Sequence, residues 1–367
     1  MKTTAKTWLK RIHNLNLTEK VKIMNVCGGH ERSISMAGLR TALPDNIELI
    51  PGPGCPVCVC PEEDIYQAIQ LALHEDIILV AFGDMLRVPV NVPKGEVRSL
   101  EQARAAGADI RPVASPLDVI ALAQRESTKK IVFFAAGFET TTAPVAAMIA
   151  QGLPENLFVL LSARLTWPAV SMLLDSGEAG FQALVAPGHV ATVMGSEEWQ
   201  FVIDKHAIPT AIAGFTAQSL LASTYSVLRQ KIEGKLFLDN CYPELVRANG
   251  NTAAKRQMSE VLDVIDANWR GVGIIPQSGF NLKAAYSQHD ARIQFPSYDE
   301  ENRRRKGKMP PGCDCASVVL GKKYPNECVL YGQACTPQEP IGPCMVSDEG
   351  ACRIWWASGV RDSSVKS

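Results

Sequence analysis

Between residues 20 and 230, short apolar runs alternate with stretches of helical periodicity, and this alternation restricts the possible folds more than any other feature. Parallel strands need long crossover connections, which helices usually supply, so the pattern predicts an α/β fold with parallel sheets covered by helices on both faces. Strands are expected at residues 21–26, 47–50, 77–82, 110–113, 131–135, 157–161, 183–186 and 210–213. Helices are expected at residues 62–73, 99–106, 116–124, 144–151, 167–174, 197–205 and 218–231.

The polar stretch at residues 125–130 divides the eight strands evenly, which favours two similar Rossmann-like domains, at residues 1–125 and 126–231. After residue 232, Gly and Pro become frequent and the alternation fades. A helix at residues 252–267 and a strand at 272–275 are expected there. The pattern predicts a smaller, mixed C-terminal domain at residues 232–367, which is rich in loops from residue 295 onward.

Charge and hydropathy exclude several classes of protein. The net charge of −1 argues against a nucleic-acid-binding surface. No apolar run reaches the ~18 residues that a membrane span needs, and residues 1–20 show no apolar core of a signal peptide. Eleven cysteines without export indicate a reducing compartment, where thiols bind metals or perform redox chemistry. We therefore expect a cytoplasmic protein without a membrane or nucleic-acid partner.

Four cysteines near the C-terminus can close a metal centre. They are Cys315, Cys328, Cys335 and Cys352. Zinc sites usually pair their cysteines in short knuckles, and none joins these four, so a [4Fe–4S] cluster is the better interpretation. Cys313 and Cys344 lie nearby and complicate the choice of ligands.

The segment Val26-Cys27-Gly-Gly-His30 follows an expected strand and precedes an expected helix at residues 33–41. Ligands bind at such turns in open α/β sheets. A cysteine near a helix N-terminus has a lowered pKa and more thiolate, and His30 can bind a metal, act as a base or orient a ligand. The alternative is a buried cysteine beside a glycine turn.

A second cysteine segment, with Cys55, Cys58 and Cys60, follows the strand at residues 47–50. Pro61 suits the first position of a helix, whose positive end would favour thiolate at Cys58 and Cys60. Cys55 and Cys58 have the Cys-x-x-Cys spacing of a redox dithiol. The alternative is half of a zinc site that Cys27 and His30 complete.

Polar side chains also follow several other expected strands. They are Asp84, Arg87, Glu139, Thr140 and His189. Each alone is as consistent with a cap or a loop contact, but their recurrence at strand ends favours a shared cleft.

At these residues the chain resembles the HypD family, which takes part in the maturation of [NiFe]-hydrogenases. The resemblance covers residues 20–356. It rests on the motifs Cys27-Gly-Gly-His30, Gly52-Pro-Gly-Cys55-Pro-Val-Cys58, Phe82-Gly-Asp-Met-Leu-Arg-Val-Pro89, Gly137-Phe-Glu-Thr-Thr141, Pro187-Gly-His-Val190, Trp269-Arg-Gly-Val-Gly273 and Met345-Val-Ser-Asp-Glu-Gly-Ala-Cys352.

The resemblance implies a redox-active scaffold on which the Fe(CN)₂CO unit of the hydrogenase is assembled. It implies that Cys27 and a cysteine of a HypC-type small chaperone hold this iron, and that a HypE-type protein donates cyanide. The hydrogenase large subunit is then an indirect partner. The family's redox pair corresponds to Cys55 and Cys58, and its [4Fe–4S] ligands correspond to Cys315, Cys328, Cys335 and Cys352.

The chain departs from the family pattern at three places. Glu31-Arg32 stands where Thr-His is expected, Ala163-Arg164 where His-Lys is expected, and His289 where an aromatic residue is expected. These departures are consistent with a divergent paralogue. Two other functions remain open: a stand-alone iron–sulfur thiol–disulfide oxidoreductase, and a structural zinc protein.

Overall fold

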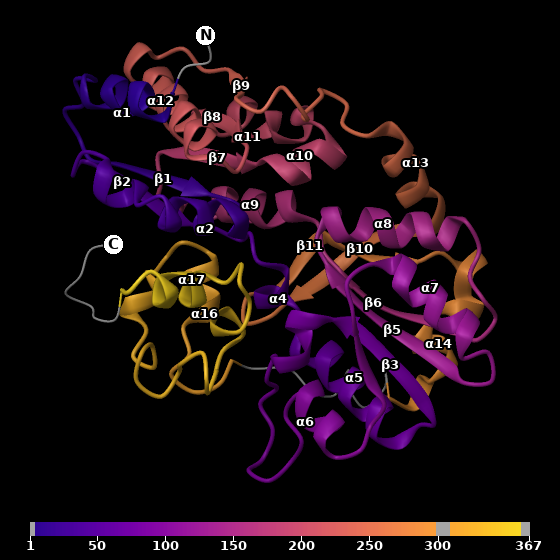
Figure 1. Ribbon diagram of the computed structural model, residues 1–367. Coiled ribbons are helices and arrows are strands. Elements are labelled where there is room, and N and C mark those ends of the chain that lie inside the picture. Colours follow the sequence, from indigo (N-terminus) through magenta and orange to yellow (C-terminus); the bar gives the residue numbers. More distant parts are fainter. Residues whose placement is uncertain (1–3, 299–308, 361–367) are drawn as a thin grey trace.

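The structure, a computed structural model, describes residues 4–298 and 309–360 of the chain. Two parallel sheets with helices on their faces form most of it, as the alternating pattern predicted (Figure 1). None of the helices within these two ranges is long and apolar enough to cross a membrane.

The first sheet joins the beginning of the chain to residues 183–240. Its strand order is β2-β1-β7-β8-β9, and every neighbouring pair is parallel. The strands are β1 (Val21–Asn25), β2 (Ile47–Pro51), β7 (Ala183–Pro187), β8 (Thr210–Ala213) and β9 (Leu238–Asn240). Ile23 of β1 packs in one core with Leu220, whereas Met24 packs in another with Val170. The sheet is therefore buried on both faces, which explains why its inner strands β7 and β8 are almost wholly apolar.

The second sheet has the order β4-β3-β5-β6 and is also parallel throughout. Its strands are β3 (Ile77–Phe82), β4 (Ile110–Val113), β5 (Lys130–Gly137) and β6 (Leu157–Ala163). Successive residues again enter different cores, as Ile78 and Leu79 illustrate. A two-stranded antiparallel hairpin, β10 (Leu262–Trp269) and β11 (Gly273–Leu282), packs beside β6 and α9.

The helices begin at recognisable caps. Ser115 and Asp118 form a capping box with Pro116 at the first helical position, and Thr216 and Asn251 cap two later helices with their side-chain oxygens. The helices are α1 (Ala5–His13), α2 (Gly28–Met36), α3 (Leu39–Ala42), α4 (Pro56–Val59), α5 (Glu62–His74), α6 (Leu100–Ala105), α7 (Pro116–Arg125), α8 (Glu139–Ala150), α9 (Thr166–Asp175), α10 (Gly188–Met194), α11 (Gln200–Asp204), α12 (Ala217–Glu233), α13 (Thr252–Val261), α14 (Ala291–Gln294), α16 (Cys315–Val319) and α17 (Ala351–Ala357).

The strands before residue 230 form where they were predicted, but the predicted grouping of the strands is wrong. Residues 1–125 and 126–231 do not each form a sheet, because β1 and β2 pair with strands beyond residue 183. A boundary at residue 125 would separate α7 from β5 and so divide the second sheet. Local periodicity identifies a strand but carries no information about its partner, which packing of the whole chain selects.

The helix predicted at residues 252–267 is wrong in its second half. Helix α13 ends at Val261, and β10 begins at the next residue. The segment from residue 262 pairs with β11 through a turn where Gly271 and Gly273 have positive φ. The helix predicted at residues 33–41 begins earlier, at Gly28, and a break at Gly38 separates it from α3.

Residues 309–360 consist mainly of loops and short helices, as expected. Helix α17 packs against α2, and α16 packs against α4, so this segment lies beside the turns that follow β1 and β2 (Figure 1). Its buried side chains share one hydrophobic core with β3 and α5. The C-terminal cysteines are thereby brought close to the N-terminal ones.

Candidate metal and redox site

Cys27 occupies the N-cap position of α2, directly after β1. The chain is tightly packed on both sides of it: a Cβ atom on Gly28 would lie 2.4 Å from the Cβ of Glu349, and one on Gly54 would lie 2.4 Å from the Cα of Cys27. The two glycines therefore allow the C-terminal segment and the second cysteine segment to approach the Cys27 turn.

Cys55 and Cys58 form a disulfide bond. Cys55 caps the short helix α4, whose first residue is Pro56. Cys55 and Cys58 line one small cavity together with Cys27 and Glu349. The structure thus brings the two N-terminal cysteine segments together, although each was found separately in the sequence.

The predicted thiolate character of these cysteines is not supported. Loss of hydration, with a smaller contribution from the Glu349 carboxylate, raises the pKa of Cys27 to about 12. Burial and the charge of Asp64 likewise raise the pKa of Cys60 to about 12. A helix N-terminus lowers the pKa of a thiol, and burial raises it. The rise caused by burial is the larger of the two effects here, so desolvation dominates.

His30 lies inside the fold, with no exposed surface. Its Nε2–H group donates to the carbonyl of Ala213 at 2.9 Å, which leaves Nδ1 as an acceptor without a partner among the described residues. Burial lowers the pKa of His30 to about 4, so the ring is neutral. One face of the ring lies against Phe215, which stacks on His189.

One carboxyl group, that of Glu349, lies beside the Cys27 turn, and a second, that of Asp84, lies near Glu349. Desolvation, together with the charge of Asp84, raises the pKa of Glu349 to about 7. Desolvation raises the pKa of Asp84 as well, and Asp84 accepts a hydrogen bond from Ser347 at 3.4 Å. Asp84 was predicted to face a ligand. Glu349 was not predicted, and the only sequence signal for it is its place in the motif that ends at Cys352.

A second cysteine group lies in residues 309–360. The Sγ atoms of Cys315, Cys344 and Cys352 all lie within 4.8 Å of one another. Hydrogen bonds with Cys315 and Cys344 lower the pKa of Cys352 to about 6, and the same contacts raise the pKa of Cys344. The structure therefore assembles three buried thiols at one point, and one of them, Cys344, was outside the predicted ligand set.

The other predicted ligands, Cys328 and Cys335, are buried close by. The thiol of Cys328 donates to the Gly312 carbonyl, and the sulfur of Cys335 accepts from the Ile341 N–H at 3.3 Å. Cys313 lies beside Cys315, which raises its pKa. Six cysteines thus offer more than the four thiolates of a [4Fe–4S] cluster, and soft thiolate donors in a loop-rich segment fit such a group.

The elements that carry the two cysteine groups pack against each other. Helix α4, which carries Cys58, packs against α16 and against the 3-10 helix Pro343–Met345, which carries Cys344. Cys55, Cys58 and the buried cysteines of the C-terminal segment belong to one hydrophobic core.

Glu31, one of the departures from the family pattern, forms a buried network. Its carboxylate accepts hydrogen bonds from Arg40 at 2.7 Å, from the Trp355 indole at 2.7 Å and from Asn25 at 3.0 Å. Arg32 is exposed and lies 3.9 Å from Asp348. Glu31 therefore connects α2, which carries Cys27, to α17, which carries Cys352.

The remaining polar residues predicted at strand ends do not all share one cleft. Glu139 is fully buried and accepts two hydrogen bonds from Thr166, at 2.6 and 2.7 Å, and burial raises its pKa to about 7. Arg87 donates to the Pro337 carbonyl at 2.8 Å. These two residues have structural contacts of their own, and none of the five polar residues predicted at strand ends lines the cavity at Cys27.

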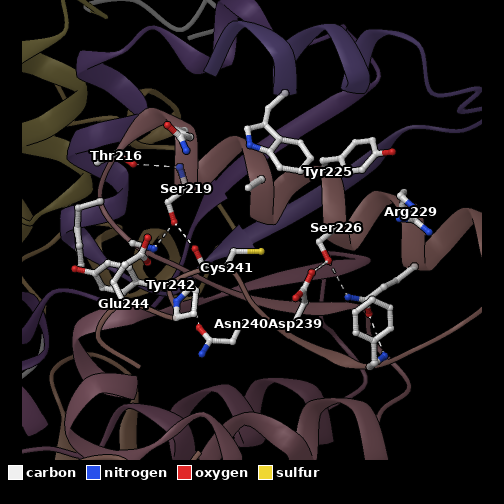
Figure 2. A pocket seen from close by; sticks show the side chains of 18 of the residues that line it. Thr216, Ser219, Tyr225, Ser226, Arg229, Asp239, Asn240, Cys241, Tyr242 and Glu244 are labelled. Carbon is white, nitrogen blue, oxygen red and sulfur yellow. Dashed lines mark hydrogen bonds between the residues drawn. The ribbon is translucent and has the colours of Figure 1, made fainter. Parts of the chain in front are cut away.

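A separate groove of about 650 Å³ runs along α12 and the segment after β9 (Figure 2). Its hydroxyl groups are satisfied within the groove, since Ser219 donates to the Cys241 carbonyl and Ser226 donates to Asp239. Phe215 lines this groove and also packs against His30. None of the predicted site residues lines it.

Comparisons with known proteins agree with the motifs. The HypD family model, described as "Hydrogenase formation hypA family", matches residues 3–359. A hydrogenase maturation factor HypD2 of Bradyrhizobium diazoefficiens is 40% identical over 348 residues, covering 92% of this chain and 89% of that protein. A putative hydrogenase expression/formation protein of Methanocaldococcus jannaschii is 38% identical over 342 residues, 92% of each chain. A hydrogenase maturation factor HypD of Escherichia coli is 37% identical over 353 residues, covering 95% of this chain and 92% of that protein.

Proposed function

Because this chain belongs to the HypD family, we propose that it acts in hydrogenase maturation, as a scaffold for assembly of the Fe(CN)₂CO unit of [NiFe]-hydrogenases. The observation that carries the proposal is the convergence of three groups. The Cys27 turn and the Cys55–Cys58 disulfide line one cavity, and the C-terminal cysteines pack against the disulfide.

The iron unit is cargo, and Cys27 is its proposed ligand on this chain. Cyanide and CO hold iron as low-spin Fe(II), for which a soft thiolate is a suitable ligand. The Cys27 thiol is protonated before iron binds, so it loses a proton as the Fe–S bond forms. A cysteine of a HypC-type small chaperone supplies a second thiolate. His30 is held neutral by burial, and its hydrogen bond to the Ala213 carbonyl fixes the ring, so that it orients the site without adding charge.

Cys55 and Cys58 are the proposed source of electrons for cyanide transfer. A HypE-type donor carries cyanide as a thiocyanate. When the S–CN bond breaks, the donor leaves as a thiolate, cyanide binds iron, and two electrons are consumed. The two thiols supply these electrons by closing to the disulfide and releasing two protons. The disulfide in the structure corresponds to the state after this step.

The C-terminal cysteines are the proposed site of a [4Fe–4S] cluster, with Cys315, Cys328, Cys335 and Cys352 as ligands. When bound, such a cluster supplies single electrons that return the disulfide to the dithiol. The contact between α4 and the cysteine-bearing elements supports this transfer. The completed iron unit then passes to the hydrogenase large subunit, and we place all these steps in the cytoplasm.

Infrared spectroscopy of the complex with its small partner, purified without oxygen, tests the proposal. Wild-type protein should show CN and CO stretching bands. Cys27→Ala should lose them, because one thiolate ligand of the cargo is gone, while it keeps the iron and acid-labile sulfide of the proposed cluster. Cys241→Ala is the matched control, since Cys241 lies in the groove along α12, and it should keep the bands. Bands that persisted in Cys27→Ala would refute the proposed iron site.

A stand-alone iron–sulfur thiol–disulfide oxidoreductase is the second candidate, favoured by the position of the disulfide beside the cysteine cluster. Turnover of dithiol substrates by protein that never shows CN or CO bands would select this function. One equivalent of zinc without sulfide would instead select a structural zinc protein.

A further inference from the structure

Arg270 is a buried arginine to which the proposed function gives no role. Its side chain has no exposed surface. The Nη2 group donates to the Pro89 carbonyl at 2.7 Å and to the Glu62 carboxylate at 3.4 Å. The Nε and Nη1 groups are also buried, and neither has a hydrogen-bond partner among the described residues. Buried donors are almost always paired, so these two groups indicate an acceptor that the chain itself does not supply.

The backbone around Arg270 lies where α4 meets the C-terminal cysteine segment. The N–H of Arg270 donates to the Val59 carbonyl at 3.0 Å, at the end of α4. A Cβ atom on the next residue, Gly271, would lie 2.9 Å from the Cβ of Ala316 in α16. The positive charge of Arg270 acts on the sulfur of Cys313. Arg270 is therefore next to both groups of cysteines.

Pro89, which accepts from the guanidinium, leads to the same cysteines from another direction. It lines one pocket together with Ile341. The N–H of Ile341 donates to the Cys335 sulfur at 3.3 Å. A Cβ atom on the following residue, Gly342, would lie 2.5 Å from the Cys315 sulfur. The guanidinium is thus held against a loop that contacts two of the proposed cluster ligands.

We propose that Arg270 is a positioning residue that donates its Nε–H and Nη1–H groups to sulfur at the [4Fe–4S] site and raises the reduction potential of the cluster. The inference rests on the proposed function, which assigns the cluster to this segment. A guanidinium group is permanently charged in proteins. Reduction adds one electron, so a nearby positive charge and hydrogen bonds to sulfur stabilise the reduced cluster more than the oxidised one. Glu62 opposes this effect, because its carboxylate pairs with the same guanidinium.

The test is a redox titration with dithionite, followed by electron paramagnetic resonance, of the full chain purified without oxygen. Wild-type protein is compared with Arg270→Met, Glu62→Gln and Arg164→Met. Arg164→Met is the matched control, because Arg164 is also buried but pairs with Asp64 and donates to the Asn268 carbonyl. Each protein is also analysed for iron, for acid-labile sulfide and for its unfolding temperature.

The two members of the Arg270–Glu62 pair should shift the potential in opposite directions. At the wild-type midpoint potential, the ratio of reduced to oxidised cluster should fall about tenfold in Arg270→Met, a shift of about 59 mV for one electron. The ratio should rise about threefold in Glu62→Gln, because glutamine keeps an acceptor oxygen but removes the opposing charge. Arg164→Met should unfold at a lower temperature and keep the wild-type midpoint. A purely structural Arg270 would lower the unfolding temperature without moving the midpoint.

An unchanged midpoint in Arg270→Met that retains its iron and sulfide would overturn the inference and assign the two N–H groups to buried water. CN and CO bands in the partner complex of the same variant would then leave the proposed function standing. An equal shift in Arg164→Met would also overturn the inference. Wild-type protein without iron and sulfide would overturn the inference and the proposed function together.

Two conservative variants decide the matter if Arg270→Met does not fold or loses the cluster. Arg270→Lys keeps the charge, and its ratio of reduced to oxidised cluster should stay within about threefold of the wild-type ratio. Glu62→Gln should still raise that ratio. An unchanged or lower ratio in Glu62→Gln would contradict an effect of this charged pair on the cluster.

Discussion

At Cys27, the N-terminus of a helix lowers the pKa of the thiol, whereas loss of hydration raises it. The sequence shows the first effect, because a glycine turn and a helix follow the cysteine. The loss of hydration comes from residues that are distant in sequence and pack around the turn, among them Glu349 and Gly54. The result is a thiol that is protonated at neutral pH, and the proposed iron would have to displace that proton. A reactive free thiolate, which the motif alone indicates, is not what this turn provides.

Gly54 is expected to tolerate no side chain. A Cβ atom there would lie 2.4 to 2.7 Å from the backbone atoms of Cys27, which cannot move without displacing the turn. Gly54→Ala should therefore lower the free energy of unfolding by about 1–3 kcal/mol, the usual cost of overpacking, and should change the rate at which Cys27 is alkylated. Gly83→Ala is the control, because no atom lies within 4 Å of a Cβ atom built there. Equal unfolding temperatures for the two variants would contradict the close approach.

Among the elements, α2 and α17 are joined by one buried carboxylate. Glu31 of α2 accepts from Trp355 of α17 and from Arg40, whose side chain is 8% exposed. Arg40 also lies over the Trp355 ring. These contacts fix the position of α2, which begins after Cys27, relative to α17, which carries Cys352. A buried ion pair contributes to such specificity only if both partners remain.

Glu31→Ala should be strongly destabilising, because it leaves the Arg40 guanidinium buried without its counter-charge. We expect a loss of about 3–5 kcal/mol in the free energy of unfolding, measured by chemical denaturation of the cluster-free protein. Arg32→Ala changes the neighbouring exposed residue and should cost less than about 0.5 kcal/mol. A Glu31→Ala variant as stable as Arg32→Ala would show that the network contributes nothing to stability.

At the scale of the whole molecule, the stability of residues 309–360 depends more on side-chain contacts than on regular secondary structure. The segment has two short α-helices, α16 and α17, and its buried surface includes five of the cysteines. Loop-rich segments of this kind often need a metal in place of a core of their own. Three of the four cores on the faces of the two sheets contain no buried side chain of this segment. The fourth, on one face of the second sheet, is shared with it.

Removal of the proposed cluster should therefore loosen one part of the molecule selectively. After anaerobic chelation of iron, amide hydrogen exchange should become faster in residues 309–360 and at α2 and α4, which pack against them. Exchange in β5 and β6 should not change, because β5 lies in the middle of the second sheet and the hairpin of β10 and β11 packs beside β6. Uniform acceleration across the chain would contradict a local role for the cluster.

The sequence by itself determined the positions of the early strands and most of the helices, and it indicated that Cys55 and Cys58 can pair. Strand and helix periods are local properties, and residues 77–82 or 110–113 form strands in any context that buries them. The Cys-x-x-Cys spacing of Cys55 and Cys58 likewise allows closure through two intervening residues, and the disulfide agrees with it.

Only the tertiary structure decided which strands pair, which thiols meet and how each of them ionises. The pairing of β1 with β7 joins residues far apart in sequence, and no local pattern distinguishes it from a pairing with β3. The meeting of Cys344 with Cys315 and Cys352, the position of Glu349 beside Cys27 and the burial of Glu31 all depend on where the C-terminal segment packs. These outcomes are set by desolvation and by contacts between distant residues, quantities that exist only once the chain is folded.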